Sequence, residues 1–264
     1  MTSPHESSPD VQELQRLLGP AVCRRLGIYP LPEGFRLSVV VPVFNEVATI
    51  DEIIRRIEQS GVPVEIIIVD DGSSDGTRDK LAALQPRNNL RVVLHDRNRG
   101  KGAALRSGFR LATGDVVVIQ DADLEYDPSD YMRLIQPIVE QQADVVYGSR
   151  FLSDSHRVLY IWHFLGNRWL TLLSNLTTNL NLSDMETCFK AFRRETLEAV
   201  LSKLCEDRFG IEPEITAKMA RVPGVRVHEV AVRYNGRTYA EGKKITWRDG
   251  FRALWCIVRY GLWD

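Results

Sequence analysis

Asp121 and Asp123 are the residues whose type and spacing most directly suggest chemistry. They follow the apolar run DVVVIQ, so a strand ending there would leave both carboxylates facing the same way. Oxygen ligands on a short loop suit Mg²⁺ or Mn²⁺, which typically bind one or two carboxylates together with phosphate oxygens and water. Glu125, two residues further on, could supply a third carboxylate. Turn formation is the alternative for such a triplet, but its position after an apolar run favours a metal site.

Three other apolar runs are also followed by polar residues, in segments 42–46, 70–73 and 148–150. Carboxylates that converge from neighbouring strands repel one another, so a shared edge of this kind implies a cation or a cationic ligand between them. Turn formation by aspartate and glycine explains segment 70–73 equally well when it is taken alone.

Lys101 stands between two glycines in the segment NRGKGAA, which opens a predicted helix. A helix start offers free N–H groups and partial positive charge to an anion. The segment lacks the spacing of a Walker A loop, and no G-x-G-x-x-G follows the first predicted strand. Lys101 is therefore a candidate phosphate contact, with an ordinary solvated helix cap as the alternative.

Short β-branched runs alternate with stretches of helical spacing between residues 36 and 150. This alternation predicts an α/β fold with a mostly parallel sheet covered by helices on both faces. Ligands bind such sheets at the carboxyl ends of the strands, where the polar segments lie. The predicted strands are LSVVVPVF, VEIIIVD, LRVVLH, DVVVIQD and ADVVYGS.

The second half has a looser pattern: an aromatic helical region, a strand near CFKAF, further helices, a strand in VRVHEVAVRY and a final amphipathic helix. No linker rich in proline, glycine and polar residues divides the halves, so we expect one domain over residues 36–264. Residues 1–35 are expected to form a tail and a helical leader broken at Gly19-Pro20.

Composition excludes several classes of protein. The 264 residues are 44% hydrophobic and 26% charged, as in ordinary soluble globular proteins. The 34 Lys+Arg and 35 Asp+Glu give a net charge of −1, which argues against a nucleic-acid partner. The four cysteines form no C-x-x-C pair, which fits a reducing, cytoplasmic compartment. The N-terminus lacks a signal-peptide pattern, and polar residues interrupt both of the most apolar stretches, so neither is expected to span a bilayer.

Five motifs follow one another along the chain: VPVFNE, VDDGSSDGT, NRGKGAALRSG, QDADLEYDP and YGSR. In this order and at these intervals they resemble the inverting GT-A glycosyltransferases of family 2, most closely the dolichyl- or polyprenyl-phosphate sugar synthases. The resemblance covers about residues 37–263 and includes the later segments 184–194 and 241–245. It implies the Rossmann-like GT-A fold, with a nucleotide-sugar-binding half over 36–150 and an acceptor-side half over 151–264.

The resemblance also implies roles for single residues. A nucleotide-diphosphate sugar, with uridine preferred to guanosine, would lie along the strand ends with Pro42, Glu46 and Asp71 near its nucleobase and ribose. Asp121 and Asp123 would hold Mg²⁺ or Mn²⁺ on the diphosphate. Glu125 stands where relatives commonly carry glutamine, another oxygen ligand.

Four basic residues would act on phosphate groups in the same scheme. Arg150 would approach the phosphates or the acceptor, while Arg237, Lys243 and Lys244 would close over the diphosphate from the C-terminal segment. Without the resemblance, Lys243 and Lys244 fit a solvated helix start better.

The resemblance implies transfer of the sugar to a polyprenyl phosphate, an acceptor that is largely anionic at neutral pH and so needs no strong general base. A soluble hydroxyl acceptor is the alternative, and it would require a base, for which Asp184 or Glu186 is the best candidate. A helix cap or turn is the other interpretation of Asp184. A non-catalytic nucleotide-sugar-binding protein is a third possibility.

The final helix carries an aromatic and aliphatic stripe with arginines elsewhere on the wheel. Such a helix suits the headgroup layer of a membrane, which would place the protein peripherally at the inner face. Packing on the core or on a second subunit, as in a homodimer, explains the stripe at least as well. The stripe comprises Trp247, Phe251, Leu254, Trp255, Val258 and Leu262.

Overall fold

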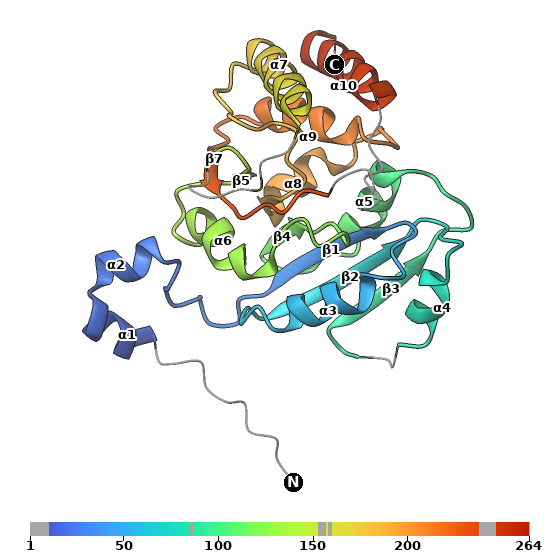
Figure 1. The fold of residues 1–264 in the computed structure, drawn as a ribbon. Coiled ribbons are helices and arrows are strands. Elements are labelled where there is room, and N and C mark those ends of the chain that lie inside the picture. Colours follow the sequence, from blue (N-terminus) through green and yellow to red (C-terminus); the bar gives the residue numbers. More distant parts are fainter. Residues whose placement is uncertain (1–10, 85–86, 153–156, 158–159, 238–246, 264) are drawn as a thin grey trace.

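The computed structural model describes residues 11–84, 87–152, 157, 160–237 and 247–263 (Figure 1). Its central element is a seven-stranded sheet in the order β3-β2-β1-β4-β6-β5-β7. Strand β6 runs antiparallel to its neighbours β4 and β5, and the other pairings are parallel. The strands are β1 (Leu37–Val43), β2 (Val64–Asp70), β3 (Leu90–Leu94), β4 (Val116–Ile119), β5 (Val145–Ser149), β6 (Lys190–Arg193) and β7 (Val227–Ala231).

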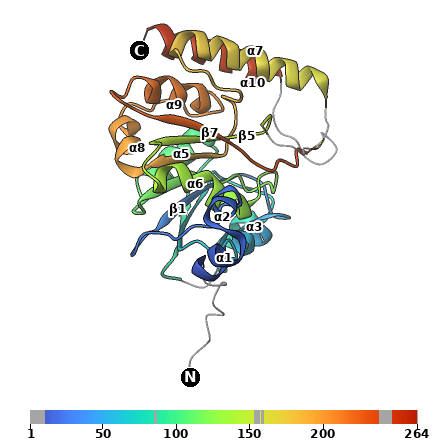
Figure 2. The same cartoon turned by 90° about the vertical axis from the view of Figure 1, so that its left-hand side faces the viewer.

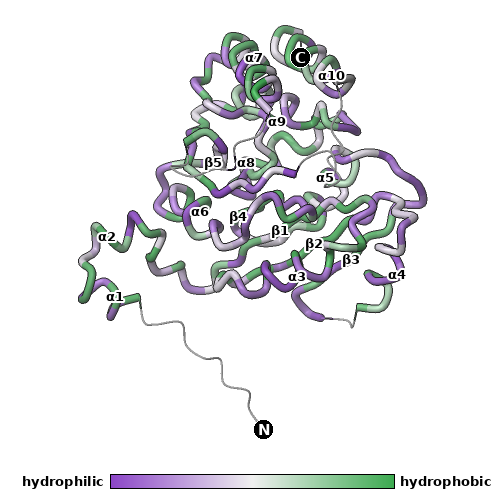
Figure 3. Tube along the Cα trace, viewed as in Figure 1, coloured by the Kyte–Doolittle hydropathy of each residue, from purple (hydrophilic) through white to green (hydrophobic). Residues whose placement is uncertain are grey.

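The β-branched runs form strands because both of their faces are buried. On β1, Val39 and Val41 belong to the core on one face of the sheet, while Val40 belongs to the core on the other. Strand β2 alternates in the same way, as expected for side chains with a period of two. Figure 3 shows the hydrophobic residues concentrated along these central strands. The expected α/β fold with a mostly parallel sheet is therefore confirmed.

Helices cover both faces of the sheet. Ile50, Ile53 and Ile57 of α3 pack into the first core together with α6, whereas α5, α8 and α9 pack into the second. The helices are α1 (Val11–Leu18), α2 (Pro20–Arg25), α3 (Ile50–Glu58), α4 (Thr77–Ala82), α5 (Lys101–Phe109), α6 (Tyr131–Val139), α7 (Ile161–Thr178), α8 (Arg194–Leu201), α9 (Ile211–Ala220) and α10 (Trp247–Leu262), with a short 3₁₀ turn, η1 (Pro128–Asp130).

The N-terminal leader forms α1 and α2, which are separated at Gly19-Pro20 as expected. It packs beside α6, where the Tyr29 hydroxyl donates to the carbonyl of Met132 at 2.6 Å. Arg24 forms an ion pair with Glu140 at 2.5 Å, and Cys23 is fully buried. The leader is thus attached to the face of the sheet that carries α3 and α6.

Helices α7 and α10 lie side by side and form the outer layer opposite the N-terminal leader (Figures 1 and 2). Their close approach depends on Gly261, where a Cβ atom would lie 2.5 Å from the side chain of Thr177. In the described part of the chain, every helix is too short or too polar to cross a bilayer.

Candidate active site

A cavity of about 840 Å³ lies at the carboxyl ends of β1, β2 and β4, as the topology requires. It is closed on the far side by residues of α7, α9 and α10. Most of the predicted site residues line this one cavity although they come from separate parts of the chain. They are Pro42, Glu46, Asp71, Lys101, Asp121, Asp123, Glu125, Arg150 and Arg237.

Lys101 and Asp121 form an ion pair in the wall of the cavity. The Lys101 Nζ atom lies 2.7 Å from Oδ1 of Asp121 and 3.7 Å from Oε1 of Glu212. Burial alone would lower the pKa of Lys101, but the charges of Asp121 and Glu212 raise it well above its ordinary value. The cavity therefore contains a permanently charged ammonium beside the first aspartate of the pair.

The start of α5 is held by Asp71. One carboxylate oxygen of Asp71 accepts the backbone N–H of Arg99 at 2.9 Å, and the other accepts that of Gly100 at 2.7 Å. The first oxygen also contacts Nδ1 of His95 at 2.8 Å. Gly100 has a φ of 102°, and a Cβ there would lie 2.3 Å from the carbonyl of Asp207. Asp71 thus fixes the loop that delivers Lys101.

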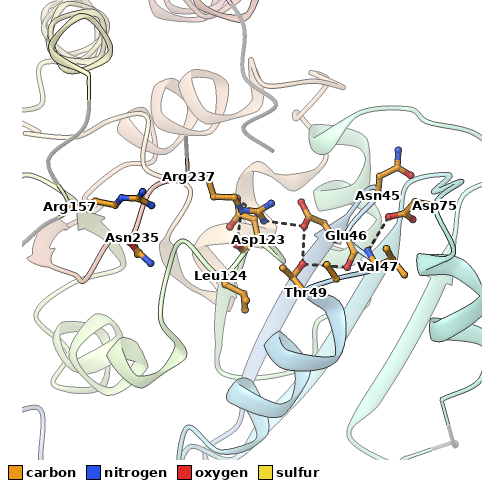
Figure 4. A pocket seen from close by; sticks show the side chains of 11 residues that line it. Asn45, Glu46, Val47, Thr49, Asp75, Asp123, Leu124, Arg157, Asn235 and Arg237 are labelled. Carbon is orange, nitrogen blue, oxygen red and sulfur yellow. Dashed lines mark hydrogen bonds and ion pairs between the residues drawn. The ribbon is translucent and has the colours of Figure 1, made fainter. Parts of the chain in front are cut away.

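Arg237 crosses the rim of the cavity and contacts three acidic residues. Its Nη2 lies 3.1 Å from Oε2 of Glu46, and its Nε donates to the carbonyl of Asp123 at 2.9 Å. Figure 4 shows the side chains of Glu46, Asp123 and Arg237 pointing toward one another. All three also line an adjoining pocket of about 420 Å³. Arg237 therefore brings positive charge to the acids that follow β1 and β4.

Glu125 anchors the segment that carries Arg237. Its Oε1 accepts the backbone N–H of Arg237 at 2.7 Å, and its Oε2 accepts the hydroxyl of Tyr234 at 2.8 Å. Both oxygens of this carboxylate are therefore engaged, and the expected role of Glu125 as a third metal ligand does not fit the arrangement.

Asp121 and Asp123 remain as candidate ligands for a divalent ion. Among the residues that the structure describes, no three His, Cys, Asp or Glu side chains gather into a group that could hold a metal by themselves. Two carboxylates that line a large cavity fit an Mg²⁺ or Mn²⁺ ion whose other ligands come from phosphate and water. The metal site accordingly stays a prediction that requires a phosphate-bearing ligand.

Asp184 lies behind Arg150 rather than in the cavity. Its two carboxylate oxygens accept Nε and Nη2 of Arg150, each at 2.7 Å, and the Asp184 side chain is 0% exposed. Burial alone would lower the pKa of Arg150, but Asp184 raises it well above its ordinary value. The expected role of Asp184 as a general base does not fit this position, because both oxygens hold Arg150 toward the cavity.

Sequence reasoning missed two residues that support or line the site. His95 follows the third strand and joins Asp71 to the hydroxyl of Ser107, 2.9 Å from Nε2. Glu212, in the first turn of α9, lines the cavity. The position of His95 after an apolar run could have indicated it, whereas nothing local distinguishes Glu212. Lys243 and Lys244 lie outside the described residues.

Comparison with known proteins agrees with this geometry. Residues 38–201 match the family model described as glycosyl transferase family 2. The chain belongs to this family. A family 2 relative, the undecaprenyl-phosphate 4-deoxy-4-formamido-L-arabinose transferase of Yersinia enterocolitica, is 31% identical over 214 residues, which are 79% of this chain and 62% of the relative. The protein of the same name from Pseudomonas paraeruginosa is 34% identical over 213 residues, 78% of this chain and 60% of the relative.

These relatives agree with the predicted family, and the chain spans about 60% of their length. Among solved structures, the glucosyl-3-phosphoglycerate synthase of Mycobacterium tuberculosis in complex with Mn²⁺, UDP and phosphoglyceric acid has a TM-score of 0.67 at 21% identity. The match covers 98% of this family 2 chain and 84% of the synthase. This likeness confirms the GT-A fold.

Proposed function

We propose that this chain is an inverting, metal-assisted glycosyltransferase that moves a sugar from a nucleotide-diphosphate sugar to a polyprenyl phosphate. The observation that carries the proposal is the cavity itself, which is lined by Asp121 and Asp123, by basic residues that include Lys101 and Arg237, and by residues of α7. The names of the curated relatives support the acceptor, because those proteins are undecaprenyl-phosphate sugar transferases.

The donor diphosphate is proposed to lie between Asp121, Asp123 and the cations of the cavity. An ion held by the two aspartates would act as a Lewis acid for the diphosphate, whose charge grows as the glycosidic bond breaks. Lys101 and Arg237 are placed to donate charge-assisted hydrogen bonds to the same group. The ion pair with Glu46 holds the guanidinium of Arg237 at the rim of the cavity, where it can donate hydrogen bonds to oxygens of a diphosphate.

Uridine is the proposed nucleobase of the donor. The solved synthases with the same fold were crystallised with UDP and with Mn²⁺ or Mg²⁺, which supports this choice without deciding it against guanosine. Thermal shift against UDP- and GDP-sugars, each with and without Mn²⁺, tests it. A ligand at a hundred times its dissociation constant adds about 2.7 kcal/mol of stability. Greater stabilisation by GDP-sugars would refute the uridine preference.

The acceptor is proposed to reach the cavity from a membrane surface that α7 and α10 contact at its cytoplasmic face. Trp162 and Trp169 of α7 are 79% and 64% exposed, and Phe251 of α10 is 67% exposed. Arg168 is the one charged residue in the α7 sequence. Indole rings beside a basic charge suit the headgroup layer of a bilayer with anionic lipids. Trp162 also lines the cavity, so this surface leads directly to the site.

A second copy of the chain could cover the same apolar surface, and the two arrangements differ in solution. Co-sedimentation with anionic vesicles together with a molar-mass measurement distinguishes them. A monomer that binds vesicles supports the membrane contact. A stable dimer that ignores vesicles refutes it.

The activity is tested with radiolabelled nucleotide sugars and polyprenyl phosphate in the presence of Mn²⁺. We expect a lipid-soluble, acid-labile product, and loss of about 10²–10³-fold in rate for Asp121→Asn or Asp123→Asn. Asp51→Asn, an exposed aspartate on α3, is the control that retains activity. Transfer only to soluble hydroxyl acceptors would refute the lipid acceptor, and donor binding without turnover on any acceptor would refute the enzyme.

A further inference from the structure

Two buried carboxylate oxygens at the wall of the cavity have no hydrogen-bond partner among the described residues. They are Oε1 of Glu186, in the segment before β6, and Oε1 of Glu212, at the start of α9. Buried acceptors in folded proteins are nearly always paired, since leaving one unpaired forfeits the hydrogen bonds it makes with water. Two such atoms lining one cavity therefore indicate a ligand that brings hydrogen-bond donors.

Glu212 lies next to the proposed diphosphate site. Its Oε2 forms an ion pair with Lys190 at 2.5 Å, while its Oε1 lies 3.7 Å from Nζ of Lys101. The same Nζ atom lies 2.7 Å from Asp121. Lys101 therefore lies between the unpaired oxygen of Glu212 and Asp121, the aspartate expected to face the diphosphate. The sugar attached to that diphosphate has to lie in this part of the cavity.

Glu186 is held in place by its backbone neighbours. Nζ of Lys190 donates to the carbonyl of Met185 at 3.1 Å and also to that of Thr187, so the residues on both sides of Glu186 are fixed. The same Nζ atom forms the ion pair with Oε2 of Glu212, so one ammonium group contacts both Glu212 and the backbone on either side of Glu186. Glu186 and Glu212 are far apart in the chain but therefore lie in the same part of the cavity.

The charges around Glu186 favour a neutral ligand over an anionic one. The cations that act on Glu186 are Lys190 and Arg150, and each is already engaged by another carboxylate, Glu212 and Asp184 respectively. A phosphate beside Glu186 would meet these carboxylates, while the two cations that act on Glu186 are already paired. Hydroxyl groups, in contrast, can donate to both unpaired oxygens and carry no charge.

We propose that Glu186 and Glu212 form the subsite for the transferred sugar, in which Oε1 of each residue accepts a hydrogen bond from a sugar hydroxyl. This inference rests on the proposed function in one respect, namely that the donor is a nucleotide-diphosphate sugar. It makes the two glutamates specificity-determining residues, because a sugar without the matching hydroxyl leaves a buried carboxylate unpaired.

Calorimetric titration of the full chain with UDP and with a panel of UDP-hexoses in Mn²⁺ tests the subsite. We expect Glu186→Gln and Glu212→Gln to weaken binding of the best UDP-hexose by about 10- to 100-fold while UDP affinity stays within about twofold. Glu214→Gln is the matched control, since Glu214 is buried on the same helix, accepts hydrogen bonds from Cys205 and Glu206, and does not line the cavity.

A second measurement uses the unaltered protein, so it does not depend on the folding of a variant. Analogues of the best UDP-hexose in which single hydroxyls are replaced by hydrogen should include at least one that binds about tenfold more weakly. The subsite is refuted if every such analogue binds like its parent, or if no UDP-hexose binds more tightly than UDP. It is also refuted if Glu186→Gln lowers only the turnover of hydroxyl acceptors, which is the behaviour of a general base.

These titrations contain no acceptor, so they separate this inference from the proposed function. Failure to form a glycosylated lipid refutes the polyprenyl phosphate acceptor and leaves the binding result standing. Equal binding of UDP and UDP-hexoses refutes the subsite even where lipid transfer is observed.

Discussion

The ammonium group of Lys101 lies 2.7 Å from Oδ1 of Asp121, which joins the first residue of α5 to the loop after β4. The start of α5 and the end of β4 thereby meet in one ion pair at the cavity. The pair places a fixed positive charge beside the carboxylate that is expected to face the donor diphosphate. Its effect on the reaction can be measured directly.

We expect Lys101→Gln to lower kcat/KM by about 10²–10³-fold, because a preorganised cation at a site of developing negative charge is removed. Steady-state kinetics with the preferred nucleotide sugar measure the loss. Lys80→Gln, on the exposed surface of α4, should leave the rate unchanged. A Lys101→Gln enzyme with normal kinetics would show that the lysine serves the local fold alone.

The positions of Lys101 and Asp121 also show how far sequence reasoning extends. Strands β1, β2, β4 and β5 could be predicted because their apolar runs are buried on both faces, whereas the apolar run of β3 forms a strand that is only partly buried. Both residues directly follow or open a predicted element, so their approach to the same sheet edge was predictable. Their direct contact was not, since it depends on how closely α5 approaches β1 and β4.

Residues brought in by long-range pairing could not be found from the sequence. Strand β6 inserts antiparallel between β4 and β5, and this order arises from contacts far apart in the chain. That insertion buries Lys190 and carries it to Glu212. A lysine in a strand and a glutamate in a helix have no local feature that indicates a buried pair, so Glu212 was missed as a site residue.

Asp184→Asn should destabilise the protein by about 3–5 kcal/mol, because it leaves the buried guanidinium of Arg150 without its counter-charge. Urea unfolding followed by tryptophan fluorescence measures the change. The double variant Arg150→Met with Asp184→Leu removes both charges and should recover much of the lost stability. Full activity in Asp184→Asn would contradict the positioning role, since Arg150 would then need no carboxylate to hold it.

Glu125→Ala should raise the KM for the nucleotide sugar and leave the Mn²⁺ concentration for half-maximal activity within about threefold. The reason is that Glu125 holds the backbone of Arg237 and the hydroxyl of Tyr234 with both of its oxygens. Asp123→Asn is the comparison and should raise that Mn²⁺ concentration by at least about tenfold. An equal shift in the two variants would restore Glu125 as a metal ligand.

Stability should fall with rising pH because of Glu186. Burial, followed by the charge of Glu212, raises the pKa of its carboxyl from 4.5 to about 7, whereas Lys190 and Arg150 lower it. Between these two values the folded chain binds the proton and the unfolded chain does not, so unfolding becomes easier as pH increases. A shift of this size corresponds to at most about 3 kcal/mol.

The comparison that isolates this contribution is the difference in unfolding free energy between the parent and Glu186→Gln, measured at pH 5 and pH 8. The parent should lose stability relative to Glu186→Gln as pH rises, and this relative loss should level off above about pH 7. The same pH dependence in parent and variant would mean that another group is responsible.

Replacing exposed indoles on α7 and α10 should separate membrane binding from chemistry. Trp169 and Trp255 are 64% and 54% exposed and do not line the cavity. Trp169→Ser with Trp255→Ser should weaken binding to anionic vesicles by at least about tenfold, because two interfacial indoles contribute about 1–2 kcal/mol together.

Turnover of a short, water-soluble prenyl phosphate by this double variant should stay within about twofold, while the KM for a long-chain acceptor in vesicles rises. Leu17→Ser, on the exposed side of α1 far from this surface, is the control for the loss of an exposed apolar residue (Figure 2). Equal vesicle binding by parent and double variant would assign the apolar surface of α7 and α10 to a protein contact instead.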